Sequence, residues 1–118
     1  MAAPVGPYTP IVRAGDWLVV SGQVGIVDGK LAGGGLEGEL RQAMANLANL
    51  LASEGATLAD VTKTTVFLRH LGGDYARMNE VYLELFGDHR PARSAIGVAE
   101  LPLGALVEVE AWAHVGAG

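Results

Sequence analysis

Arg93 is the residue whose type and position point most directly to binding chemistry. It starts a predicted strand in the segment Arg90-Pro91-Ala92-Arg93-Ser94-Ala95-Ile96, and because apolar residues follow it we expect its guanidinium to be partly buried. A buried guanidinium needs a carboxylate or an equivalent partner. From the residues alone that partner is either structural, Glu108 or Glu110, or the carboxylate of a bound substrate held by two parallel hydrogen bonds.

Two carboxylates and a serine are further candidates for a site. Glu108 and Glu110 are two positions apart in a predicted strand, so they share one face of the sheet at about 6.5–7 Å from each other. Ser21-Gly22-Gln23 follows a predicted buried strand. There the hydroxyl and the backbone N–H groups either point into a cleft or make only a strand-end hydrogen bond, and the residues leave both interpretations open.

Several classes of chemistry lack the residues that they require. The chain has no cysteine, which excludes disulfides, cysteine-ligated zinc and thiol catalysis. None of its three histidines (His70, His89 and His114) has a second histidine or a carboxylate at the spacing of a helical metal site, so no metal is predicted. Serine-hydrolase and phosphate-loop motifs are absent, and Gly33-Gly34-Gly35 is interpreted as a flexible turn before a helix.

The hydrophobic pattern predicts the elements that position these residues. Alternation and β-branched residues predict strands over 11–13, 17–21, 60–68, 93–98 and 106–115. Apolar residues at helical spacing predict helices over 36–54 and 75–86. Asp74 is the predicted N-cap of the second helix, whose predicted apolar stripe is Tyr75, Met78, Tyr82 and Leu85.

The resulting order, roughly ββ-α-β-α-ββ, predicts an α+β fold with two helices on one face of a mixed sheet. The other face then meets either water or another subunit. On the last strand that face carries two carboxylates, a tryptophan and a histidine. This mixture suits a subunit interface that contains a site better than it suits a solvent-exposed face.

Composition limits the number of domains and the kinds of partner. The 118 residues predict a single domain, 1–118. Half of them are hydrophobic and only 18% are charged, which favours an oligomer in so small a chain. The net charge of −5 disfavours nucleic acid as a partner. The sequence shows no membrane span and no secretory signal, so we expect a soluble, cytoplasmic protein.

Several segments form an ordered set that matches one known family. They are Gly6-Pro7-Tyr8, Val20-Ser21-Gly22-Gln23, Val61 to Phe67, Asn79-Glu80-Val81-Tyr82, Pro91-Ala92-Arg93-Ser94, and Leu101-Pro102 through Val107-Glu108-Val109-Glu110-Ala111. Together they resemble the RidA/YjgF family of reactive intermediate imine deaminases, from about Pro4 to Val115. The chain departs from the usual family pattern at Thr9-Pro10, Glu39 and Ala95, and in a shorter loop from Gly87 to Arg90.

The resemblance implies a chorismate-mutase-like fold and a homotrimer. The sheets of three subunits would form a barrel-like core, with helices outside and clefts between subunits. The implied activity is hydrolysis of 2-imino acids or enamines, of the 2-aminoacrylate and 2-iminobutanoate type, to 2-keto acids and ammonia without a cofactor. Arg93 matches the arginine that grips the substrate carboxylate, and Glu108 matches the glutamate near the attacking water. The residues that match the lining of the cleft are Tyr8, Ser21, Gly22 and Asn79.

Two other functions remain as alternatives. A non-catalytic trimer that binds small carboxylates as a sensor or regulatory subunit would use the same Arg93. An endoribonuclease or translation inhibitor, an activity attributed to some family members, is opposed by the charge of −5 on every subunit. The sequence leaves open which imino acid is preferred and how the roles of Glu108 and Glu110 differ.

Overall fold

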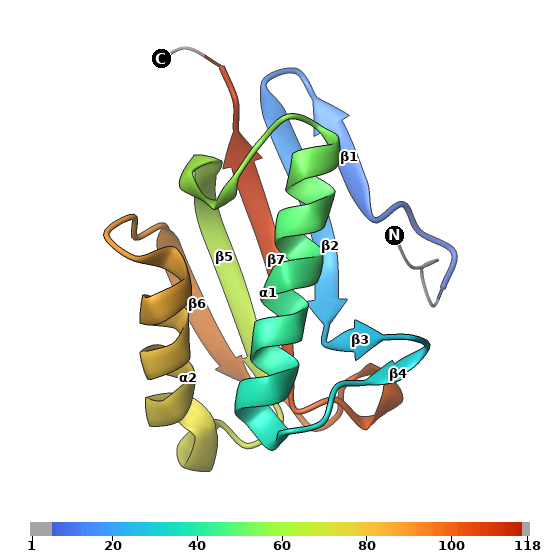
Figure 1. Cartoon of the computed structure of the whole chain (residues 1–118), viewed down its shortest axis with the longest axis vertical. Coiled ribbons are helices and arrows are strands. Elements are labelled where there is room, and N and C mark those ends of the chain that lie inside the picture. The colour runs from blue at the N-terminus through green and yellow to red at the C-terminus, as the bar shows by residue number, and fades with distance from the viewer. Residues whose placement is uncertain (1–5, 117–118) are drawn as a thin grey trace.

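A computed structural model describes residues 6–116 of the chain and shows the order of its elements (Figure 1). The strands and helices are β1 (Ile11–Ala14), β2 (Trp17–Val24), β3 (Ile26–Val27), β4 (Lys30–Leu31), α1 (Gly35–Ser53), β5 (Val61–Leu68), α2 (Leu71–Phe86), β6 (Ala92–Gly97) and β7 (Val107–His114). Short 3₁₀ turns, Leu58–Asp60 and Pro102–Gly104, precede β5 and β7. The predicted order is confirmed, with the small hairpin β3–β4 added to it.

A five-stranded sheet in the order β1-β2-β7-β5-β6 forms one layer of the molecule. Neighbouring strands are antiparallel except β5 and β6, which are parallel because α2 carries the chain back along the sheet between them. β7, the last strand in the chain, lies at the centre between β2 and β5. The sheet is therefore mixed, as predicted, and β6 forms one of its two edges.

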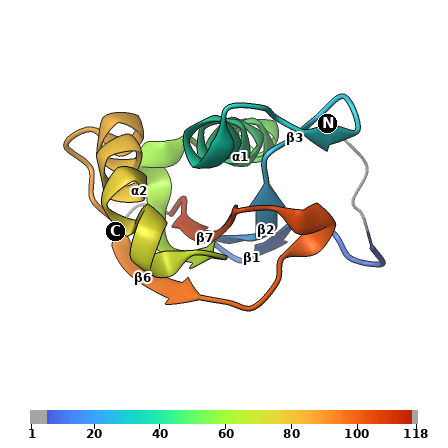
Figure 2. The ribbon, with the colours of Figure 1, turned by 90° about the horizontal axis from the view of Figure 1, so that it is seen from below.

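Both helices pack on the same face of this sheet, as the view from below shows (Figure 2). The alternation predicted for β7 is confirmed: under the helices lie the fully buried Val107, Val109, Ala111 and Ala113. The residues between them, which face away from the helices, are Glu108, Glu110, Trp112 and His114. The expectation that one face of the sheet is covered by helices and the other is not is confirmed.

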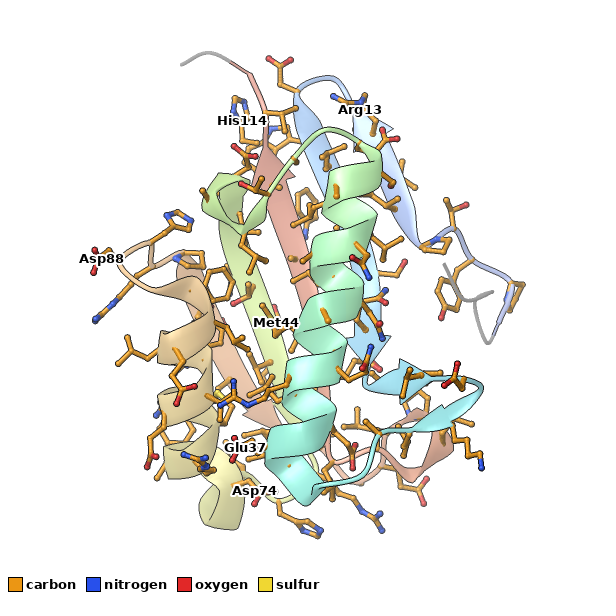
Figure 3. All side chains as sticks on the ribbon, in the orientation of Figure 1. Arg13, Glu37, Met44, Asp74, Asp88 and His114 are labelled. Carbon is orange, nitrogen blue, oxygen red and sulfur yellow. The ribbon has the colours of Figure 1, made fainter. Side chains whose placement is uncertain are left out.

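The apolar stripe of α1 supplies much of the core. Met44, in the middle of this helix (Figure 3), is only 1% exposed, and Leu40 and Leu47 on the neighbouring turns are fully buried. The helix ends at Ser53, and the chain then turns at Gly55 with a φ of 76°, a left-handed conformation that favours glycine. Across residues 6–116, neither helix combines the length and the apolar character that crossing a membrane requires.

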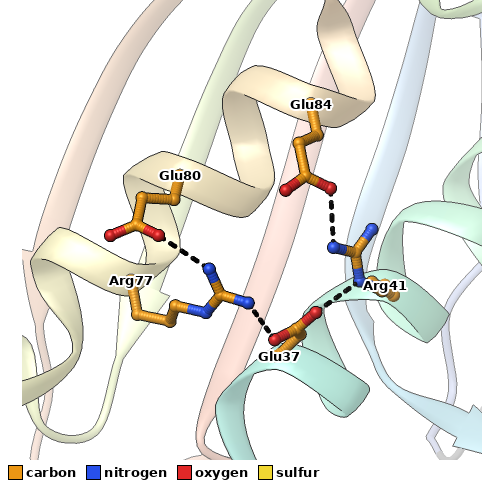
Figure 4. A network of polar contacts seen from close by, with 5 residues as sticks. All are labelled: Glu37, Arg41, Arg77, Glu80 and Glu84. Atoms are coloured by element: carbon orange, nitrogen blue, oxygen red, sulfur yellow. Dashed lines mark hydrogen bonds and ion pairs between the residues drawn. The ribbon is translucent and has the colours of Figure 1, made fainter.

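A network of ion pairs ties the exposed sides of the two helices together (Figure 4). Glu37 of α1 pairs with Arg41 on the next turn and with Arg77 of α2, and these two arginines also bind Glu84 and Glu80 of α2. Hydrogen bonds from Arg77 and then Arg41 lower the pKa of Glu37. Exposed pairs of this kind contribute little singly. As a network they fix α2 against α1.

The uncovered face of the sheet carries exposed apolar side chains from four strands. Val12, Trp17, Ile96 and Trp112 are each 37–47% exposed. The Trp17 ring meets Trp112 and His114 edge-on, with ring centroids 6.1 and 4.9 Å apart. Exposed apolar side chains of this kind, gathered on one face of a sheet, are typical of a surface that another protein chain covers.

The start of α2 corrects the sequence prediction. The helix begins at Leu71 rather than Tyr75, with His70 at the N-cap, and the Asp74 N–H already donates to the His70 carbonyl. Asp74 therefore lies in the first turn of α2 (Figure 3), where its carboxylate interacts favourably with the positive end of the helix dipole. Tyr75, assigned to the apolar stripe, is 42% exposed, whereas the unassigned Val81 is fully buried.

Candidate functional site

Arg93 lies on the helix-covered face of the sheet. It is the second residue of β6, in register with the buried Thr64 of β5. Its Nη1 donates to Asn79 Oδ1 at 2.8 Å and contacts the Met78 sulfur at 3.6 Å, and its Nη2 donates to the Tyr75 hydroxyl at 3.2 Å. All of these partners belong to α2 and are uncharged, so they orient the guanidinium without neutralising it.

Within one copy of the chain, neither Glu108 nor Glu110 is the structural partner of Arg93. Glu108 and Glu110 project from the other face of the sheet. Among residues 6–116, the ion pairs of the structure leave Arg93 without a carboxylate partner. A half-buried guanidinium without a carboxylate partner has the capacity to bind an anion from outside the chain.

Tyr82 forms a rigid platform beneath Arg93. The guanidinium carbon lies 5.0 Å from the centroid of the Tyr82 ring, within the range of a cation–π interaction. The Tyr82 hydroxyl shares a buried hydrogen bond of 2.7 Å with Thr64, and its ring packs against Phe86 at 4.6 Å between centroids. Burial raises the pKa of Tyr82, so the phenol stays neutral and keeps its hydrogen bond at physiological pH.

A cleft of about 370 Å³ lies beside Arg93, between the C-terminal half of α2 and the start of β6. The residues that line it are Asn79, Tyr82, Leu83, Phe86, Gly87, Arg90, Pro91 and Arg93. This volume is in the range of small-molecule sites, and its mainly apolar wall with a few polar groups is typical of them. Two of the predicted site residues, Arg93 and Asn79, therefore lie together in one cleft.

Glu108 lies on the uncovered face, directly against the backbone of β2. Its carboxylate occupies the space that a β-carbon at position 22 would need, so Gly22 allows this close approach. The register between β2 and β7 shifts between Val20 and Gln23, which is the local irregularity of a β-bulge. Burial, and then the nearby charge of Glu110, raise the pKa of Glu108 above its ordinary value.

Ser21, in the same irregular segment, makes a local hydrogen bond. Its Oγ donates to the Thr9 carbonyl at 2.8 Å, and its N–H donates to the Pro10 carbonyl at 2.9 Å. These bonds hold the segment that precedes β1 and that carries Tyr8, which is 42% exposed. Ser21 lies inside β2 and not at its end, because the strand continues to Val24. Its hydroxyl makes this one hydrogen bond, and its oxygen keeps the capacity to accept another.

The predicted site residues therefore form two groups that one chain does not bring together. Arg93 and Asn79 lie under α2 at the β6 edge, whereas Ser21, Gly22 and Glu108 lie on β2 and β7. β2 and β6 are separated by two strands, so about 14 Å lies between them. The side chains of Arg93 and Glu108 also point to opposite faces of the sheet.

Sequence reasoning missed the aromatic residues around Arg93. Tyr75, Asn79 and Tyr82 contact the guanidinium from one face of α2. Their spacing of four and then three residues was the available signal, because residues three and four apart share a helix face. From the sequence, Tyr75 and Tyr82 are instead predicted in the apolar stripe of the helix, and of the three only Asn79 is predicted as a residue of the cleft.

The histidines serve local contacts. His89 Nε2 hydrogen-bonds the Val61 carbonyl at 2.7 Å, and His114 packs against Trp17. Within the described part of the chain, no three His, Asp or Glu side chains gather into a group that could hold a metal ion.

Comparison with protein families decides the relationship of the chain. A family model described as Endoribonuclease L-PSP matches residues 1–115. The chain belongs to this family. It is the RidA/YjgF family, so the resemblance inferred from the sequence is confirmed.

Relatives of this RidA-family chain carry different names. A RutC family protein of Pyrococcus horikoshii is 41% identical over 113 residues, which cover 94% of this chain and 89% of that protein. The 2-iminobutanoate/2-iminopropanoate deaminase of Mus musculus is 40% identical over 116 residues, covering 97% and 85% of the two chains. The crystal structure of RidA from Psychrobacter sp. PAMC 21119 superposes with a TM-score of 0.91 at 34% identity, covering 96% and 92%.

Proposed function

We propose that this chain is a hydrolytic deaminase that converts 2-imino acids and their enamine tautomers to 2-keto acids and ammonia. The observation that carries the proposal is Arg93, half-buried, stacked on Tyr82 and without a carboxylate partner among the described residues. A 2-imino acid supplies that carboxylate next to its reactive carbon. Relatives about 40% identical named 2-iminobutanoate/2-iminopropanoate deaminase support this choice of substrate.

The site of this reaction is formed between two copies of the chain. Glu108 and Arg93 lie on opposite faces of one sheet, so Glu108 of one copy would act with Arg93 of another. Burial of the apolar face around Trp17 and Trp112 would stabilise the assembly. We propose a homotrimer with three equivalent clefts, as the family resemblance implies, because a cyclic trimer repeats one such contact three times and closes.

Arg93 binds and orients the substrate in this account. A guanidinium has five N–H donors, and Asn79, Tyr75 and Met78 engage three of them. Two remain for a substrate carboxylate. Binding this end fixes the C=N carbon relative to a water molecule, which supplies the orientation that a reaction between two free molecules lacks.

Glu108 acts as the general base and then as the acid. Its carboxylate accepts a proton as water adds to the C=N carbon of the protonated imine, and it returns this proton to the nitrogen before the C–N bond breaks. Ammonia then leaves and takes up the remaining hydroxyl proton as the C=O bond of the keto acid forms. The raised pKa of Glu108 brings the proton affinity of the carboxylate closer to that of the reacting groups. A protonated imine is already a strong electrophile, so this mechanism needs no metal and no cofactor.

The test generates the substrate in place. A D-amino-acid oxidase with catalase converts D-2-aminobutanoate to 2-iminobutanoate, and semicarbazide traps the imine that remains. The protein is expected to lower the trapped imine and raise 2-oxobutanoate. Arg93→Ala should lose about 100-fold in activity because a charge-assisted two-point contact is gone.

Arg69→Ala is the matched control, because Arg69 is exposed and does not line the cleft. It should retain the activity of the unchanged protein. If the unchanged protein is no faster than Arg93→Ala, the proposal is wrong. Saturable binding of 2-oxobutanoate without any turnover would instead identify the chain as a non-catalytic carboxylate-binding subunit.

A further inference from the structure

A second arginine, Arg90, also lines the cleft beside Arg93. Both arginines line it, and Asp and Glu are absent from its lining. Glu84, which lies on the same helix as much of this lining, is bound to Arg41 at 2.7 Å and is directed toward α1 (Figure 4). The cleft is therefore positive on an otherwise acidic chain of net charge −5, and its potential favours anions.

The backbone around Arg90 is anchored although its side chain is exposed. The preceding His89 bonds the Val61 carbonyl at 2.7 Å, and its ring packs toward Phe86 at 6.3 Å between centroids. Pro91 follows, which restricts the backbone of Arg90 to extended conformations. Arg90 is thus held at the cleft by its neighbours on both sides, and only its side chain has to move to meet a ligand.

Arg90 also differs from other arginines of the chain in its partners. Arg13, Arg41 and Arg77 each pair with at least one glutamate. Over residues 6–116, those pairs do not include Arg90 or Arg93. Two uncompensated cations in one cleft favour a ligand with two negative groups over a ligand with one.

We propose that this cleft selects 2-imino acids whose side chain ends in a second carboxylate, with Arg90 as the specificity-determining residue. The inference rests on the proposed function for the reaction itself. Arg93 would bind the carboxylate next to the imine, and Arg90 would bind the terminal one. The apolar wall formed by Tyr82, Leu83 and Phe86 would contact the methylene groups between them.

The role of Arg90 concerns binding and not the chemical step. Water adds to the imine carbon, the C–N bond breaks and ammonia leaves, while the terminal carboxylate is unchanged. Removing Arg90 therefore weakens the binding of dicarboxylic ligands selectively. Because the ion pair between Arg90 and the terminal carboxylate of the ligand is exposed to solvent, it weakens as the salt concentration rises.

Two stable keto acids of equal chain length test the preference. Isothermal titration of the full chain compares 2-oxoglutarate, with a terminal carboxylate, with 2-oxopentanoate, which ends in a methyl group. We expect 2-oxoglutarate to bind about tenfold more tightly at low salt, as one additional charge-assisted contact allows. In Arg90→Gln the ratio of the two affinities should fall to about one.

Arg69→Gln is the control for general electrostatics, since it removes the same charge away from the cleft and should preserve the ratio. Equal affinities in the unchanged protein, a preference that survives Arg90→Gln, or no binding of either keto acid would overturn the inference. The proposed function is judged separately by hydrolysis of 2-iminobutanoate. A protein that hydrolyses this imine without preferring dicarboxylates retains the function and refutes the selectivity.

Discussion

Arg93 and Glu108 belong to one sheet but project from its opposite faces. Arg93 is in register with Thr64, which is buried under the helices, and Glu108 is in register with Phe67 on the uncovered face. Changing side-chain rotamers cannot carry either group through the sheet. A site that uses both residues therefore takes them from two copies of the chain.

The contact between Glu108 and Gly22 predicts a specific effect of Gly22→Ala. The added β-carbon would meet the Glu108 carboxylate, which then has to move. We expect the rate of imine hydrolysis to fall by about 10- to 100-fold, since a displacement of about 1 Å has effects of this size. Steady-state kinetics measures the loss.

Gly33→Ala is the matched control, because a β-carbon at this position meets open space. It should preserve the rate. If Gly22→Ala is as active as Gly33→Ala, the position of the Glu108 carboxylate does not matter for the reaction.

The raised pKa of Glu108 predicts the acid limb of the pH–rate profile. A general base acts when it is deprotonated, so kcat/KM should fall as the pH drops through the pKa of Glu108, above the ordinary value of 4.5. Glu110→Gln removes a nearby negative charge that favours the protonated form. The midpoint of the acid limb should therefore move to lower pH.

The same profile measured in Glu108→Gln should lose the acid limb along with most of the activity. A Glu110→Gln profile whose midpoint rises, or does not move, would show that the charge of Glu110 does not act on the catalytic group.

The buried hydrogen bond between Thr64 and Tyr82 predicts a stability effect beneath the cleft. Tyr82→Phe leaves the fully buried Thr64 hydroxyl without this partner, which should lower the free energy of unfolding by about 1–2 kcal/mol. Urea denaturation measures the change. In the double variant Thr64→Val, Tyr82→Phe part of this loss should return, because both polar groups are gone.

A loss in the double variant that equals the sum of the single losses would contradict a direct Thr64–Tyr82 interaction.

The variant Tyr82→Leu separates the effect of Tyr82 on stability from its effect on substrate binding. It removes the ring beneath Arg93 and should raise KM for the imino acid more than Tyr82→Phe, which keeps a ring.

Much of the fold follows from local patterns in the sequence, and the division of the site does not. Alternation in β7 and the apolar spacing of α1 predict both elements because period and burial are local properties. The first turn of α2 was not predicted because it contains Gly72 and Gly73. Each glycine in a helix is unfavourable, but this helix includes both.

The face that each site residue occupies depends on strand register, which is not local. Arg93 points under the helices because β6 pairs in parallel with β5, and the Glu108 carboxylate meets Gly22 at an irregularity between β2 and β7. Neither pairing is encoded in the residues around Arg93 or Glu108. The sequence therefore predicts which residues could react but not that one chain separates them.

Complementation between two variants tests most directly whether the site joins Arg93 of one copy to Glu108 of another. Arg93→Ala and Glu108→Gln are each expected to be inactive alone. Co-expressed in equal amounts and assembled at random into the proposed trimer, the two variants together should regain about one quarter of the unchanged protein's activity, because each cleft has a chance of ½ × ½ of containing both native residues. A mixture that is no more active than the separate variants, although mixed trimers have formed, would contradict a site shared between copies.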